Sequence, residues 1–345
     1  MSAARLITPV VQRWLDDARR DPERFWDRAA RELPWFRTWD KTFEWTPPTF
    51  RWFIGGETNL CHNAIDHHVA NGRGGHAALI YLNERGERAV YTYAQVLYEV
   101  KRIAAALRGL GIHKGDRVTI YMPVSAEAVM LMLATVRIGA IHSVVFAGFG
   151  ANALGDRIAA SGSKALFTAD FTYRKGKDVA LTPIAEEALE VASRGGARVE
   201  HVVVWERRSS HVASGFSRTG HMNWSDFLKR GEGQSSDVEK MEANEPAWIL
   251  ATSGTTAKPK LAIHTHGGYQ VHIVSMGKWC FGMTPDDVWW ATSDIGWIVG
   301  HSYMVYAPLV IGCTSVVFEG ALDHPSPEAN WRAVVEEFGA TGIFT

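Results

Sequence analysis

Residues 252–260 read Thr-Ser-Gly-Thr-Thr-Ala-Lys-Pro-Lys, and they directly follow an apolar run, Trp248-Ile-Leu-Ala251, that is typical of a strand. Backbone N–H groups made accessible by Gly254, several hydroxyl donors and the ammonium of Lys258 all favour an anion. A Walker A loop is excluded, because Pro259 follows the lysine. We therefore predict a loop that wraps the polyphosphate of a nucleotide; an ordinary polar turn between a strand and a helix is the alternative. The candidate phosphate-binding residues are Thr252, Ser253, Gly254, Thr255, Thr256 and Lys258.

Outside this loop, strand and helix patterns alternate along most of the chain. Thr92 and Gln95 form a capping box before a helix whose apolar face includes Val96 and Leu107. Residues 125–138 are apolar nearly all round, which predicts a buried helix. Short strands are expected at residues 117–121, 141–146, 165–168 and 201–205. This alternation predicts an α/β fold of mostly parallel sheets flanked by helices, in two similar subdomains.

The expected domain organisation has three parts. Residues 1–85 form an N-terminal arm, with helices near residues 10–18, 22–31 and 59–70. Residues 86–240 form the first α/β subdomain, and residues 241–345 begin the second, which contains the phosphate loop. The junction is expected near residues 206–240, because this stretch reads as surface loops around one short helix at 224–230.

Composition narrows the possible partners and compartment. The 36 basic and 37 acidic side chains leave no electrostatic signature for nucleic acid or an anionic membrane. No apolar run is long enough to span a membrane, and the start of the chain lacks the apolar core of a signal peptide. Cys61, Cys280 and Cys313 are few and show no pairing pattern, so a reducing cytoplasm is expected. Nothing in the sequence predicts the oligomeric state.

The loop at 252–260 resembles the phosphate-binding motif of the acyl-adenylate-forming enzymes, and its surroundings resemble acetyl-CoA synthetases and their close relatives. The supporting blocks follow the order of that family and cover nearly the whole chain. They are Trp52–Leu60 with Asn63, Val144–Phe149, Arg174–Lys177, His264–Tyr269, Ser293–Tyr303 and Phe318–Gly320. The resemblance implies ligation of acetate or propionate to CoA through an acyl-adenylate, with ATP, Mg²⁺ and CoA as the other participants.

The resemblance also implies roles for individual residues. The 252–260 loop would hold the β- and γ-phosphates of ATP. The basic segment would meet the 3′-phosphate and adenine end of CoA, two further positions would face the thiol substrate, and a third group would line the acyl pocket. The CoA positions are Arg174, Lys175, Gly176, Lys177, Val299 and Asp323, and the acyl-pocket positions are Trp297, Ile298 and Val299. For Trp297, plain core packing is the alternative, and for Arg174–Lys177 a solvated basic turn.

This chain departs from the family pattern in two ways. Val299 stands where the family commonly has Thr, Asp323 where it commonly has Asn, and Ala257 and Leu261 where it has Gly. The family also continues into an acidic Mg²⁺ ligand, a β-barrel and a mobile C-terminal domain that carries the adenylation lysine, all beyond residue 345. From this we expect no complete catalytic set here, low activity and low stability of the isolated chain. A non-catalytic nucleotide- or CoA-binding fragment is therefore the alternative.

Other motifs suggest competing functions. Residues 148–153, Gly-Phe-Gly-Ala-Asn-Ala, fit the dinucleotide fingerprint, and Asp170 stands where a ribose-binding acid is expected. This NAD-linked oxidoreductase alternative lacks a catalytic Lys/Tyr or His/Asp pair downstream. Cys61, His62, His67 and His68 match no zinc template, so no metal site is predicted. We expect His264 and His266 to cap, or hydrogen-bond near, the start of a helix at 267–279.

Overall fold

The computed structural model describes residues 8–207, 221–252 and 259–345. Its larger sheet confirms the expected α/β fold with mostly parallel strands. Neighbouring strands in it are parallel except for the last pair, β14 and β15, which form an antiparallel hairpin. In spatial order its strands are β12 (His221–Asn223), β11 (His201–Trp205), β8 (Ala165–Ala169), β6 (Arg117–Tyr121), β7 (Ile141–Val144), β14 (Pro246–Thr252) and β15 (Lys260–Thr265).

The smaller sheet repeats this design. Its strands are also parallel except for one antiparallel edge pair, β4 and β5. In spatial order they are β18 (Gly342–Phe344), β16 (Val288–Ala291), β17 (Thr314–Glu319), β4 (Ala77–Asn83) and β5 (Arg88–Thr92). Two sheets of like construction confirm the expected pair of similar subdomains.

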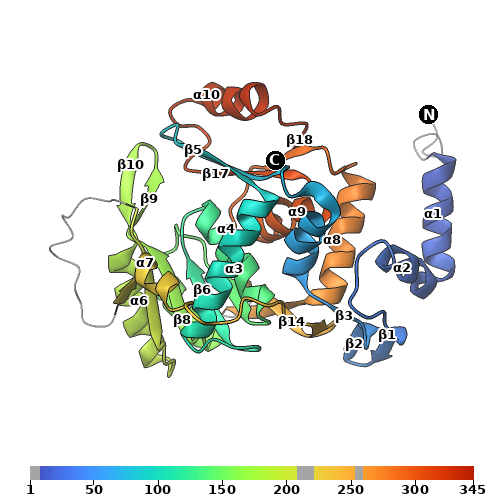
Figure 1. Cartoon of the computed structure of the whole chain (residues 1–345), viewed down its shortest axis with the longest axis horizontal. Helices are drawn as coiled ribbons and strands as arrows, with labels where there is room; N and C mark the ends of the chain where they lie inside the picture. The colour runs from blue at the N-terminus through green and yellow to red at the C-terminus, as the bar shows by residue number, and fades with distance from the viewer. Residues whose placement is uncertain (1–7, 208–220, 253–258) are drawn as a thin grey trace.

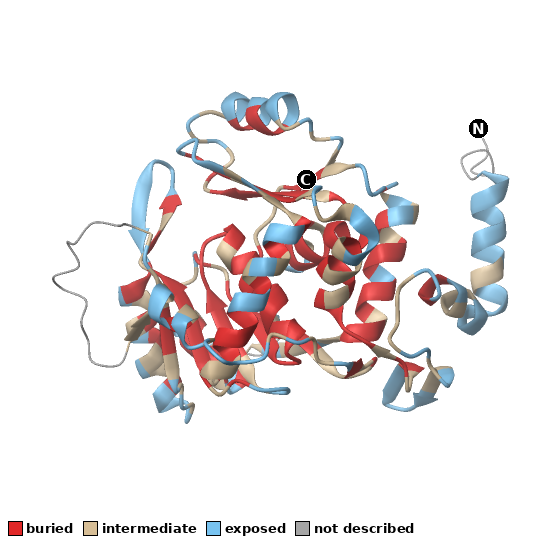
Figure 2. Cartoon of the chain, viewed as in Figure 1, coloured by how far each residue is buried: buried red, intermediate tan, exposed pale blue. Residues whose placement is uncertain are grey.

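Helices form layers between and outside the sheets (Figure 1). The central layer contains α3 (Tyr93–Gly109), α4 (Ala126–Arg137), α8 (His266–Cys280), the π-type segment η4 (Gly300–Tyr306) and α9 (Ala307–Ile311). The outer elements are α5 (Ala151–Ser161) and α6 (Thr182–Arg194) on the larger sheet, and α10 (Pro327–Trp331) and η5 (Arg332–Glu337) on the smaller one. The short helix α7 (Trp224–Lys229) packs beside α3, and its Phe227 joins the central core. Figure 2 shows that buried residues gather in the central helices and in the strands of the two sheets.

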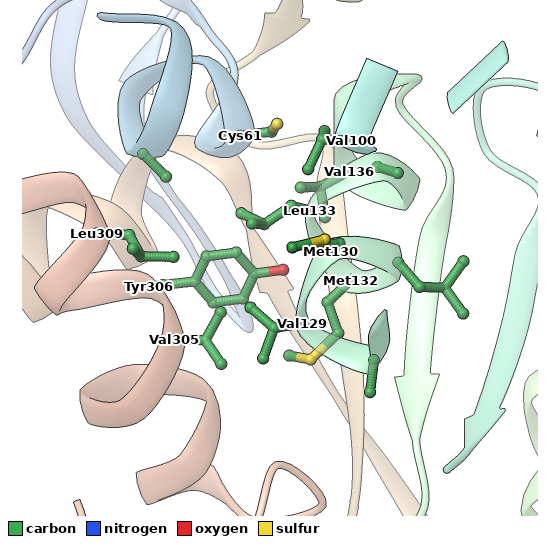
Figure 3. Packing of buried hydrophobic residues seen from close by; sticks show 14 of the residues in the cluster. Cys61, Val100, Val129, Met130, Met132, Leu133, Val136, Val305, Tyr306 and Leu309 are labelled. Atoms are coloured by element: carbon green, nitrogen blue, oxygen red, sulfur yellow. The ribbon is translucent and has the colours of Figure 1, made fainter. Parts of the chain in front are cut away.

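The central helices fit their layer because of their sequences. All but one of the described residues of α4 are buried, as expected for a helix that is apolar nearly all round. The capping box of Thr92 and Gln95 is confirmed at the start of α3, and Val96 and Leu107 are buried on its core face. Figure 3 shows the ring of Tyr306 inserted between Leu133, Met130 and Val129 of α4. The two sheets therefore share one continuous apolar core.

The sheets do not follow the expected division at residues 85 and 240. β4 lies within the segment assigned to the arm, yet it pairs with β17 of the smaller sheet. β14 and β15 lie after residue 240, yet β14 pairs with β7 of the larger sheet. The reason is that strand partners are set by which apolar faces can be buried together, and the chain crosses between the sheets more than once.

The N-terminal arm is tied to α8 by aromatic and amide contacts. It contains α1 (Pro9–Arg20), α2 (Pro22–Ala30), β1 (Lys41–Thr46), β2 (Thr49–Ile54), β3 (Glu57–Thr58, paired with β13, Met241–Glu242) and the π-type segments η2 (His62–Asp66) and η3 (Val69–Arg73). Trp14 packs edge-on against Trp279 with 4.7 Å between ring centroids, and Asn63 donates to Gln270 over 2.7 Å.

In the described part of the chain, no helix is both long and apolar enough to cross a membrane.

Candidate functional site

A cleft of about 600 Å³ opens where strands of both sheets end. Its walls come from the segments that follow β6, β7, β16 and β17, together with the hairpin of β9 (Phe171–Arg174) and β10 (Lys177–Ala180). The carboxyl edge of a parallel sheet is where open α/β folds bind ligands. Sequence-predicted residues that line this cleft are Arg174, Lys175, Trp297 and Asp323, with Gly148 of the dinucleotide-like motif beside them.

The basic segment Arg174–Lys177 is a tight two-residue hairpin. Arg174 and Lys177 pair across it, and Lys175 and Gly176 at its tip have positive φ angles of 50° and 74°. This is the geometry of a type I′ turn, which suits Gly and costs energy for Lys. All four residues are exposed, but Gly176 and Lys177 are not among the residues that line the cleft.

Two predicted CoA residues meet each other at the rim of the cleft. The ammonium of Lys175 lies 2.8 Å from Oδ2 of Asp323, and both side chains are more than half exposed. The hydrogen bond from Lys175 lowers the pKa of Asp323. Val299, another predicted CoA position, lies apart from them and is half-buried at the start of η4.

Glu84 is a central residue that sequence reasoning missed. It follows β4 and is buried, and its carboxylate accepts the N–H groups of Lys175 at 3.0 Å and Gly176 at 2.6 Å. It also accepts the N–H of Ala321, at 2.8 Å, from the turn after β17. Gly320 is required in that turn, since its φ is 123° and a Cβ there would lie 2.5 Å from a Glu84 carboxylate oxygen. One buried side chain thus joins two walls of the cleft.

A second buried network lies behind the hairpin. Arg207 and Glu319 form a two-pronged ion pair at 2.6 and 2.7 Å, with side chains only 5% and 2% exposed. Tyr81 donates to the same carboxylate over 2.6 Å, and the N–H of Tyr173 donates to it over 3.2 Å. Burial alone would lower the pKa of Arg207, but the hydrogen bond and charge of Glu319 outweigh it and raise that pKa. The network fixes β9, β11 and β17 relative to one another.

The segment expected to form the acyl pocket lies at the opposite wall. Trp297 and Ile298 are 47% and 42% exposed, so the alternative of plain core packing for Trp297 is wrong. The Trp297 ring packs beside Phe146 and Phe149, with centroid distances of 6.0 and 5.9 Å, and it lines the cleft. Ile298 and Val299 are not among the lining residues.

Asp294 also lines the cleft, and sequence reasoning did not single it out. Its carboxylate accepts the N–H of Gly296 over 2.7 Å, and burial raises its pKa to about 6 in spite of that bond. Gly300 lets the backbone approach, because a Cβ there would lie 1.9 Å from the carbonyl oxygen of Asp294. The turn before η4 is therefore tightly packed.

The segment that carries the predicted phosphate loop is a β-hairpin. The expected strand before the loop is confirmed as β14, and it pairs with β15 rather than leading directly into a helix. Thr252 closes the described end of the hairpin, since its hydroxyl donates to the carbonyl of Lys260 over 3.3 Å. The remaining candidates lie outside the described residues: Ser253, Gly254, Thr255, Thr256 and Lys258.

Stacked aromatic rings support this hairpin. Trp248 of β14 is parallel to His264 of β15 at a centroid distance of 3.8 Å, and to His301 of η4 at 4.1 Å. His142 of β7 continues the stack, 5.4 Å from His301, and shares a 2.6 Å hydrogen bond with Tyr306. Burial lowers the pKa of His264 to about 4 and that of His301 to about 3. These imidazoles are therefore neutral at pH 7.

The expected caps at the start of α8 are only partly confirmed. His264 stacks on Trp248 and makes no cap, whereas His266 does make a hydrogen bond there: its Nδ1 accepts the N–H of Leu60 over 3.2 Å. Burial lowers the pKa of His266 to about 3. The reason for the difference is that β15 is a strand and directs His264 into the sheet.

The competing motifs have structural roles. Asp170 accepts the N–H groups of Phe171 and Arg207 at 2.9 and 3.2 Å, so its carboxylate is engaged at the strand end. Gly148 packs against Phe146, whose ring would lie 2.4 Å from a Cβ. His68 contacts the carbonyl of Val310 at 3.1 Å. The described residues contain no group of three or more His, Cys, Asp or Glu that could hold a metal ion.

Comparison with known proteins agrees with this geometry. A family model described as AMP-binding enzyme matches residues 66–345, and one described as acetyl-coenzyme A synthetase N-terminus matches residues 11–64. The chain belongs to the AMP-binding enzyme family. A 3-hydroxypropionyl-coenzyme A synthetase of Metallosphaera sedula is 44% identical over 326 residues, which cover 94% of this chain and 48% of that protein. An acetyl-coenzyme A synthetase of Rubrobacter xylanophilus is 41% identical over 331 residues, or 96% of this chain and 50% of that protein.

A third relative, an acetyl-coenzyme A synthetase of Deinococcus radiodurans, is 42% identical over 324 residues. The chain spans about half the length of these curated relatives. The match removes the NAD-linked alternative, because the dinucleotide-like motif lies inside a segment that the AMP-binding family covers in full.

Proposed function

We propose that this chain is part of an ATP-dependent, AMP-forming ligase that joins a short-chain carboxylate to CoA. The observation that carries the proposal is the single cleft that contains Trp297 on one wall and Arg174 and Lys175 on another. A short acyl group and the phosphate end of CoA can therefore occupy one cavity. The membership of the AMP-binding enzyme family supports the adenylate intermediate.

The reaction has two steps. A carboxylate oxygen attacks the α-phosphorus of ATP, which forms an acyl phosphate anhydride and releases pyrophosphate. The sulfur of CoA then attacks the acyl carbon, the thiol loses its proton, and AMP leaves. The protein contributes positioning and charge neutralisation in both steps.

The residues of this chain divide between the two substrates. The loop 252–258 would hold the β- and γ-phosphates, with Thr252 at the strand end and Lys258 as the cation. Mg²⁺ would accompany ATP and neutralise part of the charge of its phosphates. Arg174, Lys175 and Lys177 would hold the phosphate end of CoA, because Arg174 and Lys175 line the cleft and Lys177 pairs with Arg174 across the same exposed hairpin.

The carboxylate is acetate, propionate or, as the name of the Metallosphaera sedula relative suggests, 3-hydroxypropionate. These acids differ by one methylene or one hydroxyl, and a hydrophobic pocket discriminates such differences by only about 1–3 kcal/mol.

The three free cysteines, of which Cys61 and Cys313 are buried, fit a reducing cytoplasm.

The test is carboxylate-dependent ATP–pyrophosphate exchange on the 345-residue chain, with titrations of ATP and CoA binding alongside. Exchange with one of the three acids would support the proposal and rank the substrates. Binding of ATP and CoA without exchange would leave a non-catalytic binding fragment. A chain that binds neither ligand while its melting curve shows it to be folded would contradict the proposal.

A further inference from the structure

The carboxylate of Glu84 has an unusual set of partners for an acidic residue beside an expected anion site. It is buried and accepts three backbone N–H groups, two from the tip of the β9–β10 hairpin and one from the turn after β17. Neither turn is close to Glu84 in sequence. Both turns line the cleft, through Arg174 and Lys175 on one side and Asp323 on the other.

The hairpin tip would be a different anion site without Glu84. Successive N–H groups at residues with positive φ, here Lys175 and Gly176, form a concavity that binds anions by itself. Glu84 occupies this concavity from the protein side. A ligand phosphate must therefore be bound by the side chains of the hairpin, and their directions depend on the conformation that Glu84 stabilises.

The conformation needs such support. Lys175 has a φ of 50°, which costs energy for a residue with a side chain. Hydrogen bonds to a charged acceptor are stronger than those between neutral groups, and here two of them hold the tip. The third bond, from Ala321, links the tip to the turn that ends in Asp323. Glu84 thus holds the basic hairpin next to the turn after β17, where Lys175 and Asp323 meet.

The geometry points to Glu84 as a positioning residue that orients the basic hairpin Arg174–Lys177 for the 3′-phosphate of CoA. This inference rests on the proposed function, because it assumes that the hairpin meets CoA. Glu84 itself touches no ligand. It determines how well the cleft distinguishes CoA from dephospho-CoA, which lacks that phosphate.

The experiment compares the dissociation constants of CoA and dephospho-CoA for the wild-type chain, Glu84→Gln, Glu84→Asp and a control, Glu87→Gln. Glu87 lies in the same turn and is exposed, and its side chain accepts a bond from Asn83 over 2.6 Å. The control therefore removes the same charge without touching the hairpin. A thermal melt of each variant reports folding.

For the wild-type chain we expect a preference for CoA over dephospho-CoA. Glu84→Gln should reduce that preference by about tenfold. The substitution removes the negative charge and replaces one acceptor oxygen by an NH₂ group, which cannot accept a backbone N–H. Glu84→Asp, which keeps the carboxylate, should restore part of the preference, and Glu87→Gln should keep all of it. ATP affinity should stay unchanged in all variants.

Three results would overturn the inference. One is an unchanged preference in Glu84→Gln, and another is an equal loss of affinity for both ligands in a folded variant. If Glu84→Gln does not fold, Glu84→Asp decides: a preference equal to wild type despite the shorter side chain would overturn it. A wild-type chain that binds ATP but shows no preference for the 3′-phosphate would refute the CoA site of the proposed function as well.

Discussion

Two turns of this molecule are expected to meet phosphate groups, and they are supported by different chemistry. The hairpin Arg174–Lys177 is held by the Glu84 carboxylate and, behind it, by the buried pair of Arg207 and Glu319. The β14–β15 hairpin is supported by neutral rings, with Trp248 stacked between His264 and His301. Charged hydrogen bonds are directional and fix a turn that carries strain, whereas stacked rings fill space and tolerate sliding.

This difference makes the two regions respond to different perturbations. Loss of a buried charge behind the hairpin should weaken CoA binding and leave ATP binding intact. Loss of ring contact or protonation of the imidazoles should do the reverse. Each prediction below tests this separation.

The largest effect is expected from Arg207→Met. The substitution leaves Glu319 buried without its cation, which costs about 3–5 kcal/mol of folding free energy. Denaturant unfolding would measure this loss, and CoA binding should weaken more than ATP binding. The control is Arg102→Met, since Arg102 is exposed and forms its ion pair with Glu99, three positions earlier on α3. Adding Glu319→Gln to Arg207→Met should recover part of the stability; no recovery would mean that the loss comes from packing of the arginine stem.

Acid should destabilise the ring-supported region. Burial holds the pKa of His301 at about 3 and that of His264 at about 4, while an unfolded histidine has a pKa near 6.5. Between these values the unfolded chain binds more protons, so stability falls as the pH decreases from about 6.5. Each such imidazole should cost about 2 kcal/mol at pH 5 relative to pH 7. The raised pKa of Asp294, about 6, acts in the opposite direction, because its folded form takes up a proton first.

The measurement is denaturant unfolding at pH 7, 6 and 5. His301→Gln should flatten the pH dependence, since it removes one titrating group while keeping a polar side chain of similar size. A stability that does not change between pH 7 and 5 would contradict the prediction.

A smaller effect is expected from His264→Ala. The substitution removes a ring that stacks on Trp248 at 3.8 Å, and such aromatic contacts contribute about 0.5–1.5 kcal/mol beyond the buried area. The chain should remain folded, with weaker ATP binding and unchanged CoA binding. The exposed His76, which directly precedes β4, provides the control, because His76→Ala removes an imidazole from the smaller sheet and leaves the hairpin unchanged. Equal losses for both ligands would show that the two regions are not separate.

The elements of the fold were predictable because their signals are local. The capping box at Thr92, the apolar helix α4 and the short strands all depend on neighbours within a few residues. Membership of a sheet was not predictable, because β4 and β14 pair with strands far away in the chain. The expected division at residues 85 and 240 therefore carries no information about these long-range pairings.

The candidate site divides in the same way. Arg174 and Trp297 could be named because they belong to short motifs, and the cleft includes both. Glu84 could not, since its partners lie 91, 92 and 237 positions away and its own turn looks like a solvated loop. Arg207 reads as the start of a basic loop, and only the fold brings it to Glu319, 112 positions away. A buried charged pair can be identified only when the three-dimensional distance between the two residues is known. The spacing of apolar residues in the sequence does not give that distance.

The smallest effect is expected from Asp323→Asn, which tests the charge balance of the hairpin Arg174–Lys177. The carboxylate of Asp323 lies 2.8 Å from the ammonium of Lys175 and competes with any phosphate for that cation. Because both groups are exposed, the pair contributes little to stability and the melting temperature should not change. Removing the charge should raise CoA affinity by about twofold to fivefold, less so at high salt, and should leave dephospho-CoA affinity nearly unchanged. The control Asp286→Asn removes an exposed carboxylate that pairs with Arg73, away from the cleft. Weaker CoA binding in Asp323→Asn would instead mean that this pair holds Lys175 in its binding position, so that Glu84 and Asp323 act together on the same hairpin.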